Sequence, residues 1–477
     1  MATDISCKQE LEAVQMARTG ILQAMSWVQG SLTLHGSDIN SGILNGALAD
    51  CGKLYDESQA RLARLLSGES HDCNDARTWL SGAFASHRTC LDGLEENGLV
   101  EPQVGAQNLT MLLREALALY VKGRGTGTGV GTGTGTGVPR TPKSNQTEGL
   151  LTSWNATTSK ADLVVAKDGT GTHTTISDAV AALAKMGRRR PKRVIIYVKS
   201  GVYVEQVEIR MGMKNVIFIG DGIDRTIVTA NQNVLEGSST TFGSATFGVS
   251  GDRFWARDMT FENTAGPEKH QAVALRVSSD HSLFYRCSFK GFQDTLFVHS
   301  QRQFYRDCQI YGTIDFIFGD AAVVFQNCDI FVKRPMRDQA NMITAQGRDD
   351  PNANTGISIQ GSRVLPAPEF SAVKGMFKSY LGRPWGKYSR TVLLKTDLDG
   401  LIDPKGWTEW SGNFALSTLF YGEYMNSGTG ASTEKRVEWP GFHVLTDPQD
   451  TSPFTVKNFI QGESWILASG VPFSPGI

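Results

Sequence analysis

Hydrophobic positions divide the chain into two parts with different periodicity. Up to about residue 122, apolar residues recur at three- to four-residue spacing, as in 78–84. This spacing places them on one face of an α-helix and predicts a small all-α domain. From about residue 162 onward, short β-branched and aromatic runs such as 193–198 dominate and predict β-strands.

A segment of nearly alternating Gly and Thr, residues 123–137, separates the two parts. This composition cannot bury a core and predicts a flexible linker. A phosphate-binding loop would need a strand before the glycines and a Lys-Ser or Lys-Thr pair directly after them, and neither is present. We therefore expect a helical domain over 1–122, a Gly/Thr-rich linker over 123–161 and a strand-rich domain over 162–477.

Three cysteines mark a repeat in the strand-rich part. Cys287, Cys308 and Cys328 sit in similar aromatic strand motifs, 21 and 20 residues apart, and Met259 holds the equivalent place one repeat earlier. One strand motif in about twenty residues is typical of a solenoid, and strand-rich repeats with Asn and Gly at the corners predict a parallel β-helix. The cysteines should then form an inward ladder, by packing alone or with a disulfide between two neighbours.

The same repeat brings two acids together. Asp294 follows Cys287 by seven residues, and Asp315 follows Cys308 by seven. Equivalent positions in adjacent coils stack about 4.8 Å apart, so the two carboxyl groups should be neighbours. Two carboxylates this close cannot both ionise easily, which leaves one protonated as an acid and the other anionic as a nucleophile.

Turn capping is the alternative role for each aspartate. Apolar residues surround Asp315 in 312–319, and a carboxylate buried there without a partner would be costly, which favours a functional role. Gln293 directly precedes Asp294, and Gln271 lies 22 residues before Gln293, which places the two amides on neighbouring coils.

Five ordered segments resemble the signature motifs of plant pectin methylesterases, and the resemblance extends from about residue 164 to near the C-terminus. The segments are 201–205, 271–275, 293–296, 315–319 and 381–385. The resemblance implies a right-handed parallel β-helix and a pectinesterase that hydrolyses methyl esters of homogalacturonan to pectate and methanol. It implies no metal and no organic cofactor.

The resemblance also implies a role for each matching polar residue. Asp315 is the implied nucleophile, and Asp294 is the implied acid and, later, base. Gln271 and Gln293 would stabilise the oxyanion by hydrogen bonding. Arg383 would orient the nucleophilic carboxylate and keep it ionised.

Aromatic residues are candidates for contact with the polysaccharide. By the same resemblance, Trp385 would line the sugar cleft. We also consider Phe242, Phe318, Trp407 and Trp410, and for each of these four the alternative is packing in the core.

The helical part resembles the pectin methylesterase inhibitor domain that many plant enzymes carry as a pro-region. Segments 47–56, 78–81 and 89–93 carry this match. The resemblance implies an autoinhibitory four-helix bundle and a disulfide between Cys51 and Cys90.

Other cysteines have no assigned partner. Seven is an odd number, so at least one cysteine is unpaired or pairs with another chain. Cys7 has no nearby partner, and Cys73 is unassigned. The segment 139–143 also lacks the dibasic motif at which such pro-regions are often cleaved, so processing is not predicted from this sequence.

Charge and hydropathy limit the partners. The 47 basic residues nearly cancel 48 acidic ones, which favours neither nucleic acid nor a membrane surface. No run of about eighteen apolar residues predicts a membrane span, and the N-terminus lacks the pattern of a signal peptide. The sequons at Asn108, Asn145 and Asn155 can arise by chance, so the expectation of a secreted cell-wall protein rests on the pectin substrate.

Two other functions compete with this one. A polygalacturonase or pectate lyase would act on the same polymer, through an acid and a base that flank the glycosidic bond or through calcium ligands. The paired Gln and Asp residues fit ester chemistry better. A non-catalytic inhibitor or binding protein would be expected to lack the two aspartates, and both are present.

Overall fold

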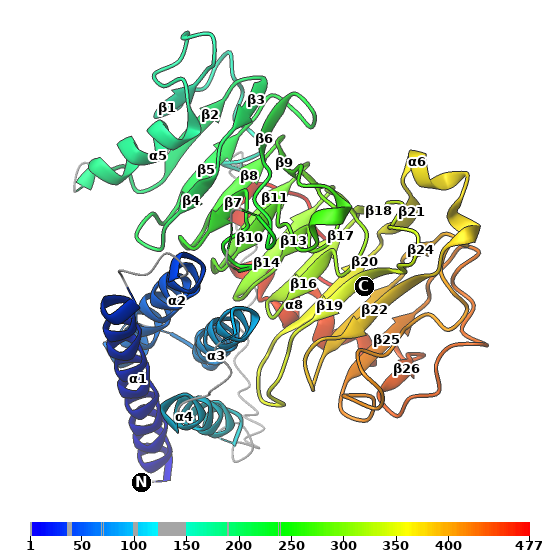
Figure 1. The fold of residues 1–477 in the computed structure, drawn as a ribbon, viewed down its shortest axis with the longest axis horizontal. Coiled ribbons are helices and arrows are strands. Elements are labelled where there is room, and N and C mark those ends of the chain that lie inside the picture. Colours follow the sequence, from blue (N-terminus) through cyan, green and yellow to red (C-terminus); the bar gives the residue numbers. More distant parts are fainter. Residues whose placement is uncertain are drawn as a thin grey trace, which may run out of the picture.

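The computed structural model of the protein describes residues 2–35, 41–67, 69, 71–98, 104–122, 149–187, 190–236, 238 and 240–477. Within these ranges, the strands form three parallel sheets that wind into a β-helix, and a bundle of four long helices lies against its side. Figure 1 shows the bundle in blue and the β-helix from green to orange. The parallel β-helix and the helical N-terminal part are both as predicted.

The strands are assigned to the three sheets in an order that repeats along the chain. Sheet A contains β1 (Leu163–Val165), β2 (Val194–Val198), β5 (Val216–Ile219), β8 (Trp255–Arg257), β11 (Ser282–Tyr285), β14 (Arg302–Arg306), β17 (Ala322–Gln326), β20 (Gly356–Gln360), β23 (Arg390–Leu394), β25 (Phe420–Tyr424) and β26 (Phe442–Val444). Sheet B contains β3 (Gly201–Val204), β6 (Thr226–Ala230), β9 (Thr260–Asn263), β12 (Ser288–Lys290), β15 (Gln309–Gly312), β18 (Asp329–Val332), β21 (Arg363–Pro366) and β24 (Asp397–Leu398). Sheet C contains β4 (Val207–Ile209), β7 (Phe247–Val249), β10 (Leu275–Val277), β13 (Leu296–Phe297), β16 (Ile317–Gly319), β19 (Asn341–Gln346) and β22 (Ser379–Pro384).

Single residues with left-handed backbone turn the chain from sheet A to sheet B. They include Asp258 (φ 58°), Arg286 (φ 50°), Asp307 (φ 53°) and Asn327 (φ 57°). Asn and Asp tolerate this conformation better than most side chains. The corner residues also pair between coils, Arg286 with Asp258 at 2.7 Å and Asn327 with Asp307 at 2.6 Å.

Ladders of like residues fill the inside of the β-helix. Phe284 stacks on Tyr305 with ring centroids 4.8 Å apart, and Tyr305 stacks on Phe325 at 4.7 Å. The predicted cysteine ladder is present beside these rings, with Cys287, Cys308 and Cys328 buried as free thiols. Packing therefore accounts for the ladder, without the disulfide that had remained an alternative.

The N-terminal bundle consists of α1 (Ala2–His35), α2 (Ser41–Leu66), α3 (Cys73–Glu96) and α4 (Val104–Lys122). Asp72 caps α3, since its carboxylate accepts hydrogen bonds from the backbone N–H groups of Asn74 and Asp75, both at 2.8 Å. The disulfide implied by the resemblance is present: Cys51 and Cys90 join α2 to α3. Cys73 is an exposed free thiol.

Short helices complete the fold. They are α5 (Ile176–Lys185), η2 (Pro267–Lys269), α6 (Pro368–Ser371), η3 (Lys374–Met376), α7 (Pro448–Thr451), η4 (Ser452–Phe454), α8 (Val456–Phe459), η5 (Gly462–Ser464) and η6 (Leu467–Ser469). The segment that contains α8, η5 and η6 packs over the outer face of sheet A together with Leu151 and Trp154. Arg257 fastens this layer by donating hydrogen bonds to the backbone carbonyls of Leu151 and, at 3.1 Å, Trp154.

Several predicted features lie outside the described residues. They are most of the linker, 123–148, with the sequon at Asn145 and the segment 139–143, and also the side chain of Cys7. The other two sequon residues, Asn108 and Asn155, are exposed. Among the described helices, none is long and apolar enough to cross a membrane.

The aromatic ladder leads to a stability prediction. Phe284→Ala removes a fully buried ring from a stack, and the resulting cavity should lower the free energy of unfolding by about 3–5 kcal/mol. Phe414→Ala is the matched control, since Phe414 is 39% exposed and its loss should change the free energy by less than about 0.5 kcal/mol. Denaturant unfolding followed by tryptophan fluorescence measures both changes, and equal effects would contradict the importance of the ladder.

Candidate active site

Asp294 and Asp315 lie side by side on adjacent coils. Strands β13 and β16 pair in register with Leu296 opposite Ile317. Asp294 lies two residues before Leu296, and Asp315 lies two residues before Ile317. The Asp294 backbone N–H donates to the Ile314 carbonyl at 3.0 Å, which ties the two turns together. This is the neighbour relation that the cysteine spacing predicted.

Both aspartates have a left-handed backbone, with φ 63° at Asp294 and φ 49° at Asp315. Asp258 and Asp307 adopt the same conformation at corners of the β-helix, so it does not by itself mark a functional site. Both acids are, however, almost inaccessible to solvent, with Asp294 7% and Asp315 5% exposed. Burial of a carboxyl group is costly, so simple turn capping does not explain these two acids.

Arg383 on β22 distinguishes the two acids. Its Nη2 lies 2.6 Å from Asp315 Oδ2, and its Nε donates to Asp315 Oδ1 at 2.9 Å, which makes a bidentate pair. Burial raises the pKa of Asp315, but the hydrogen bonds and charge of Arg383 oppose this rise. The pKa of Asp294 is raised further, well above its usual range, because it is buried and faces the charge of Asp315. Of the two acids, Asp294 is therefore the one whose protonated form is favoured more, while Arg383 favours the ionised form of Asp315.

A cavity of about 290 Å³ collects the polar residues singled out from the sequence. Gln271, Gln293, Asp294, Asp315 and Arg383 all line it. The backbone N–H of Ala272 donates to the Gln293 carbonyl at 3.3 Å, which shows that the two glutamines also come from adjacent coils.

The aromatic candidates separate into two groups. Phe242, Phe318, Trp385 and Trp410 line the cavity, and Arg383 lies over the Trp410 ring at 4.4 Å. Trp407 does not: it is fully buried and stacks on Tyr421 with ring centroids 4.1 Å apart. For Trp407, the alternative of core packing is correct.

The structure adds a residue that the sequence did not single out. Phe297 stacks on Phe318 with ring centroids 4.2 Å apart and forms part of the cavity floor. The signal was available, because Phe297 follows Asp294 by three residues as Phe318 follows Asp315. The stacking rule applied to the aspartates applies equally to this pair.

Helix α3 of the bundle forms one wall of the same cavity. Thr89, Asp92, Gly93 and Glu96 line it opposite the catalytic candidates. Among the described residues, no hydrogen bond joins the bundle to the five polar residues of the site. No group of three or more His, Cys, Asp or Glu side chains in the described ranges is arranged to hold a metal ion.

Two family models match the chain. Residues 162–463 match the model described as Pectinesterase, and residues 6–119 match the model described as plant invertase/pectin methylesterase inhibitor. Probable pectinesterase/pectinesterase inhibitor 36 of Arabidopsis thaliana is 60% identical, over 98% of this chain and 94% of its own length. Pectinesterase 2 of Citrus sinensis is 46% identical, over 100% of this chain and 91% of its own length.

Solved structures resemble the β-helix part. Pectin methylesterase from carrot is 52% identical, with a TM-score of 0.65 over 68% of this chain and 100% of that chain. A pectin methylesterase in complex with a hexasaccharide is 26% identical, with a TM-score of 0.52 over 67% of this chain and 99% of that chain. The chain therefore belongs to the pectinesterase family and carries at its N-terminus a domain of the pectin methylesterase inhibitor family.

Proposed function

We propose that this pectinesterase removes methyl esters from homogalacturonan with Asp315 as nucleophile and Asp294 as acid and base, and that its N-terminal bundle is an autoinhibitor. The observation that carries the catalytic proposal is the pair of buried aspartates on adjacent coils, of which Arg383 contacts only Asp315 at hydrogen-bond distance. An anion and a protonated acid at this separation are what ester cleavage through an acyl-enzyme needs.

In the first half of the reaction, the Asp315 carboxylate attacks the ester carbonyl carbon. The carbonyl oxygen becomes an oxyanion, and the side-chain amides of Gln271 and Gln293 line the same cavity and can donate to it. Collapse of this intermediate breaks the bond to the methoxy oxygen, which takes the Asp294 proton and leaves as methanol. The galacturonyl group stays on Asp315 as an anhydride.

In the second half, Asp294 has become a carboxylate and acts as a base. It takes a proton from a water molecule that attacks the anhydride carbonyl, and the free galacturonate and the Asp315 carboxylate are regenerated. Asp294 regains its proton from this water, and the second proton of the water leaves with the product acid and passes to solvent, so water is the only co-reactant consumed. Arg383 stabilises the Asp315 carboxylate as nucleophile and as leaving group.

The aromatic surface around this pair suits a sugar chain. Phe242, Phe318 and Trp385 are proposed to contact the sugar rings, and Trp410 lines the same cavity. A pectin methylesterase of this fold has been solved in complex with a hexasaccharide, which supports an oligosaccharide ligand for the groove. The structures and relatives that match are named as pectinesterases, so cleavage of the glycosidic bond is not favoured.

Autoinhibition is supported by the position of the bundle along sheet C. Besides the cavity at the aspartates, a cavity of about 500 Å³ is lined by Glu57 of α2 and Arg276 of β10. Another, of about 290 Å³, is lined by Thr89 of α3 and Trp385. A polymer that must lie along this groove would collide with α2 and α3.

We also propose the domain division and the location. The helical domain would span 1–122, the linker 123–161 and the β-helix domain 162–477. Residues 149–161 pack on sheet A, so we treat 149–477 as the catalytic unit in experiments. Because pectin is a cell-wall polymer, we propose secretion to the wall, where Asn108 and Asn155 are exposed for glycosylation.

Replacement of the nucleophile tests the mechanism. In the segment 149–477, Asp315→Asn should reduce methanol release from methylated pectin by about 10³-fold or more, because the amide cannot attack the ester. Asp329→Asn is the control, since Asp329 forms an exposed ion pair with Arg363 on sheet B and should leave the rate unchanged. Near-normal methanol release by the Asp315 variant would refute the assignment.

The pH dependence tests the role of Arg383. Asp315 must be ionised to attack, and Arg383 holds its pKa down against the effect of burial. Arg383→Gln should therefore raise the pKa of Asp315 and move the acid limb of the pH profile of kcat/KM to higher pH. Arg383→Lys keeps a charge and should move the limb less, while Arg363→Gln at an exposed pair should not move it. An acid limb that stays in place in Arg383→Gln would rule out this role.

A change on α3 tests autoinhibition. A Cβ atom at Gly82 would lie 1.9 Å from Nε2 of the buried Gln301, so Gly82→Leu should push α3 away from the groove. Methanol release by the full chain should rise towards that of the segment 149–477. Gly30→Leu on α1 is the matched control, since a Cβ atom there meets nothing within 4 Å and the rate should stay low. If the full chain is as active as the segment from the start, the bundle is not an inhibitor.

A further inference from the structure

A second pair of aspartates stacks on adjacent coils, away from the catalytic pair. Strands β8 and β11 pair with Trp255 opposite Leu283. Asp252 lies three residues before Trp255 and Asp280 three residues before Leu283, so the two aspartates occupy equivalent positions. The Asp280 backbone N–H donates to Asp252 Oδ1 at 3.1 Å. Both carboxyl groups are buried, with Asp252 7% and Asp280 3% exposed, and the catalytic mechanism uses neither.

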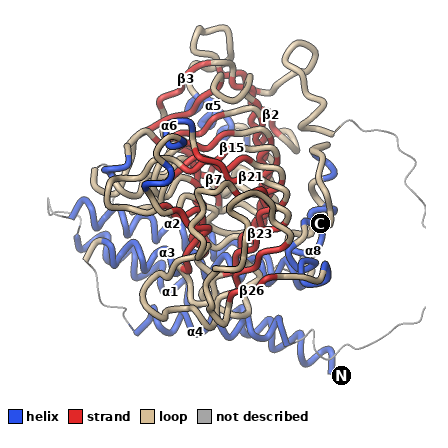
Figure 2. The backbone as a smooth tube through the Cα atoms, turned by 90° about the vertical axis from the view of Figure 1, so that its right-hand side faces the viewer, coloured by secondary structure: helices blue, strands red, loops and turns tan. Residues whose placement is uncertain are grey.

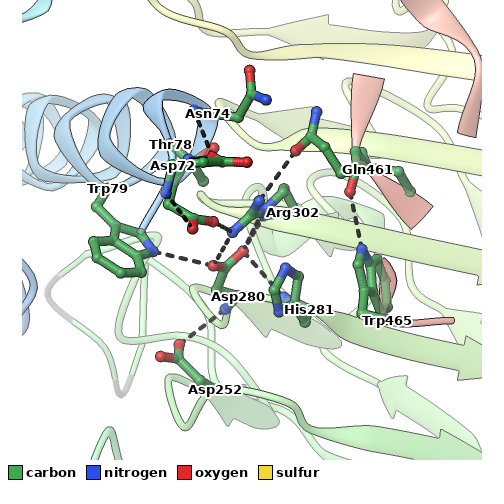
Figure 3. A network of polar contacts seen from close by, with 12 residues as sticks. Asp72, Asn74, Thr78, Trp79, Asp252, Asp280, His281, Arg302, Gln461 and Trp465 are labelled. Carbon is green, nitrogen blue, oxygen red and sulfur yellow. Dashed lines mark hydrogen bonds and ion pairs between the residues drawn. The ribbon is translucent and has the colours of Figure 1, made fainter. Parts of the chain in front are cut away.

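The Asp280 carboxylate is bound both from the β-helix and from the bundle. Arg302 holds it with two hydrogen bonds, from Nε at 2.9 Å and from Nη2 at 2.7 Å. The indole Nε1 of Trp79 on α3 donates to the same carboxylate at 3.1 Å. Arg302 Nη2 in turn donates to Asp75 of α3 at 2.6 Å. Figure 3 shows Trp79, Asp280 and Arg302 converging beside α3.

Asp252 is bound by two arginines of α2. Arg61 Nη1 donates to Asp252 Oδ1 at 2.9 Å, and Arg64 Nη1 donates to Oδ2 at 3.1 Å. Arg61 also donates from Nη2 to the Ser278 carbonyl at 2.8 Å. The Arg61 side chain is only 3% exposed, so the pair it makes with Asp252 is shielded from water and from salt.

The charges of the two surfaces are complementary. Within this set of contacts, the β-helix supplies two carboxylates and one guanidinium, while the bundle supplies two guanidiniums and one carboxylate. Within this set, the β-helix side carries a net charge of −1 and the bundle side a net charge of +1, so the docked set is neutral, whereas another docked position would bury some of these charges without a partner. Burial of an unpaired charge is costly, so this arrangement favours one docked position strongly over others.

We infer that Asp252, Asp280 and Arg302 form a docking surface for the helical domain that is distinct from the catalytic groove. The partner of this surface is the N-terminal bundle of the same chain. The bundle presents Arg61 and Arg64 on α2, and Asp75 and Trp79 at the start of α3. These contacts hold the bundle, while the later part of α3, from Thr89 to Glu96, lines the groove and forms no hydrogen bond to the proposed catalytic residues among the described atoms. This inference rests on the proposed autoinhibition and names the contacts that maintain it.

Retention after cleavage follows from this assignment. The contacts run directly from α2 and α3 to the β-helix, so a cut between residues 122 and 149 does not remove any of them. The cut chain should remain a closed complex. Release of the active site then needs disruption of the docking surface, in addition to any proteolysis.

The test uses variants of the full chain with two independent measurements, methanol release and the radius of gyration from small-angle scattering. Arg61→Gln combined with Arg64→Gln should shift the docking equilibrium by about 30-fold, raise methanol release by up to that factor and increase the radius of gyration. Asp252→Asn should act in the same direction. All three changes together should have little more effect than the arginine pair alone, because they remove one interaction.

The control is an interface arginine that lies at the rim. Arg114 on α4 pairs with Asp349 but is 45% exposed, so Arg114→Gln should change neither measurement by more than about two-fold. As a further test, the chain is cut by a specific protease between residues 122 and 149. The two fragments of the unsubstituted chain should co-elute in size-exclusion chromatography, whereas those of the Arg61→Gln, Arg64→Gln variant should separate.

The outcomes distinguish the two proposals. If the arginine pair variant stays closed by scattering, or separates no more readily than the Arg114 variant, the docking surface is refuted. Autoinhibition would still stand in that case if Gly82→Leu raises methanol release. If the arginine pair variant opens but its methanol release stays unchanged, the docking surface is correct and autoinhibition is wrong.

Discussion

In-register stacking of parallel coils is the constraint on which the core, the active site and the domain interface all depend. Hydrogen bonds between successive coils hold each residue opposite its equivalent about 4.8 Å further along the axis. Inside the β-helix, this spacing suits the Phe284–Tyr305 stack and the cysteine ladder. On the outside it forces like charges together, as at Asp294 and Asp315.

The two acid pairs differ in the number of guanidinium groups that neutralise them. The proposed catalytic pair has a single guanidinium at hydrogen-bond distance, from Arg383, and the pKa of the other acid, Asp294, is raised well above its usual range by burial and by the charge of Asp315, which favours its proposed role as an acid. At Asp252 and Asp280, three guanidiniums are within hydrogen-bond distance, and the pKa of Asp280 lies well below its usual range, chiefly because Arg302 opposes the effect of burial. The ratio of guanidiniums to carboxylates is thus the difference between the proposed proton-transfer site and the proposed docking surface.

Much of the site could be predicted from the sequence because it follows from local spacing. The distance from Cys287 to Asp294 equals that from Cys308 to Asp315, and the repeat alone brings the acids together. The same rule would have found Phe297, which pairs with Phe318. Arg383 lies 68 residues beyond Asp315, after repeats with longer loops, so the repeat spacing does not predict that the two residues are in contact. Only the resemblance to the family motif indicated this contact.

Other features depend on tertiary contacts that local spacing does not encode. Trp407 and Trp410 are three residues apart, yet one packs in the core and the other lines the cleft. The docking surface joins residues nearly 200 positions apart, such as Arg61 and Asp252. No periodicity links the bundle to the β-helix, so the part of α3 that enters the groove could not be predicted from one sequence.

The closed state keeps the catalytic residues in a complete arrangement. Arg383 already holds Asp315, the two acids are already buried, and the bundle forms no hydrogen bond to any of the five polar residues within the described chain. Gly93 of α3 lines the cavity, and Gly82 lies against Gln301, where a Cβ atom would clash, so both glycines let α3 approach the β-helix closely. The proposed inhibition would therefore act on access to the groove. Because activation would then require only removal of α3 and no rearrangement of the acids, the free energy that controls the enzyme would lie in the domain interface.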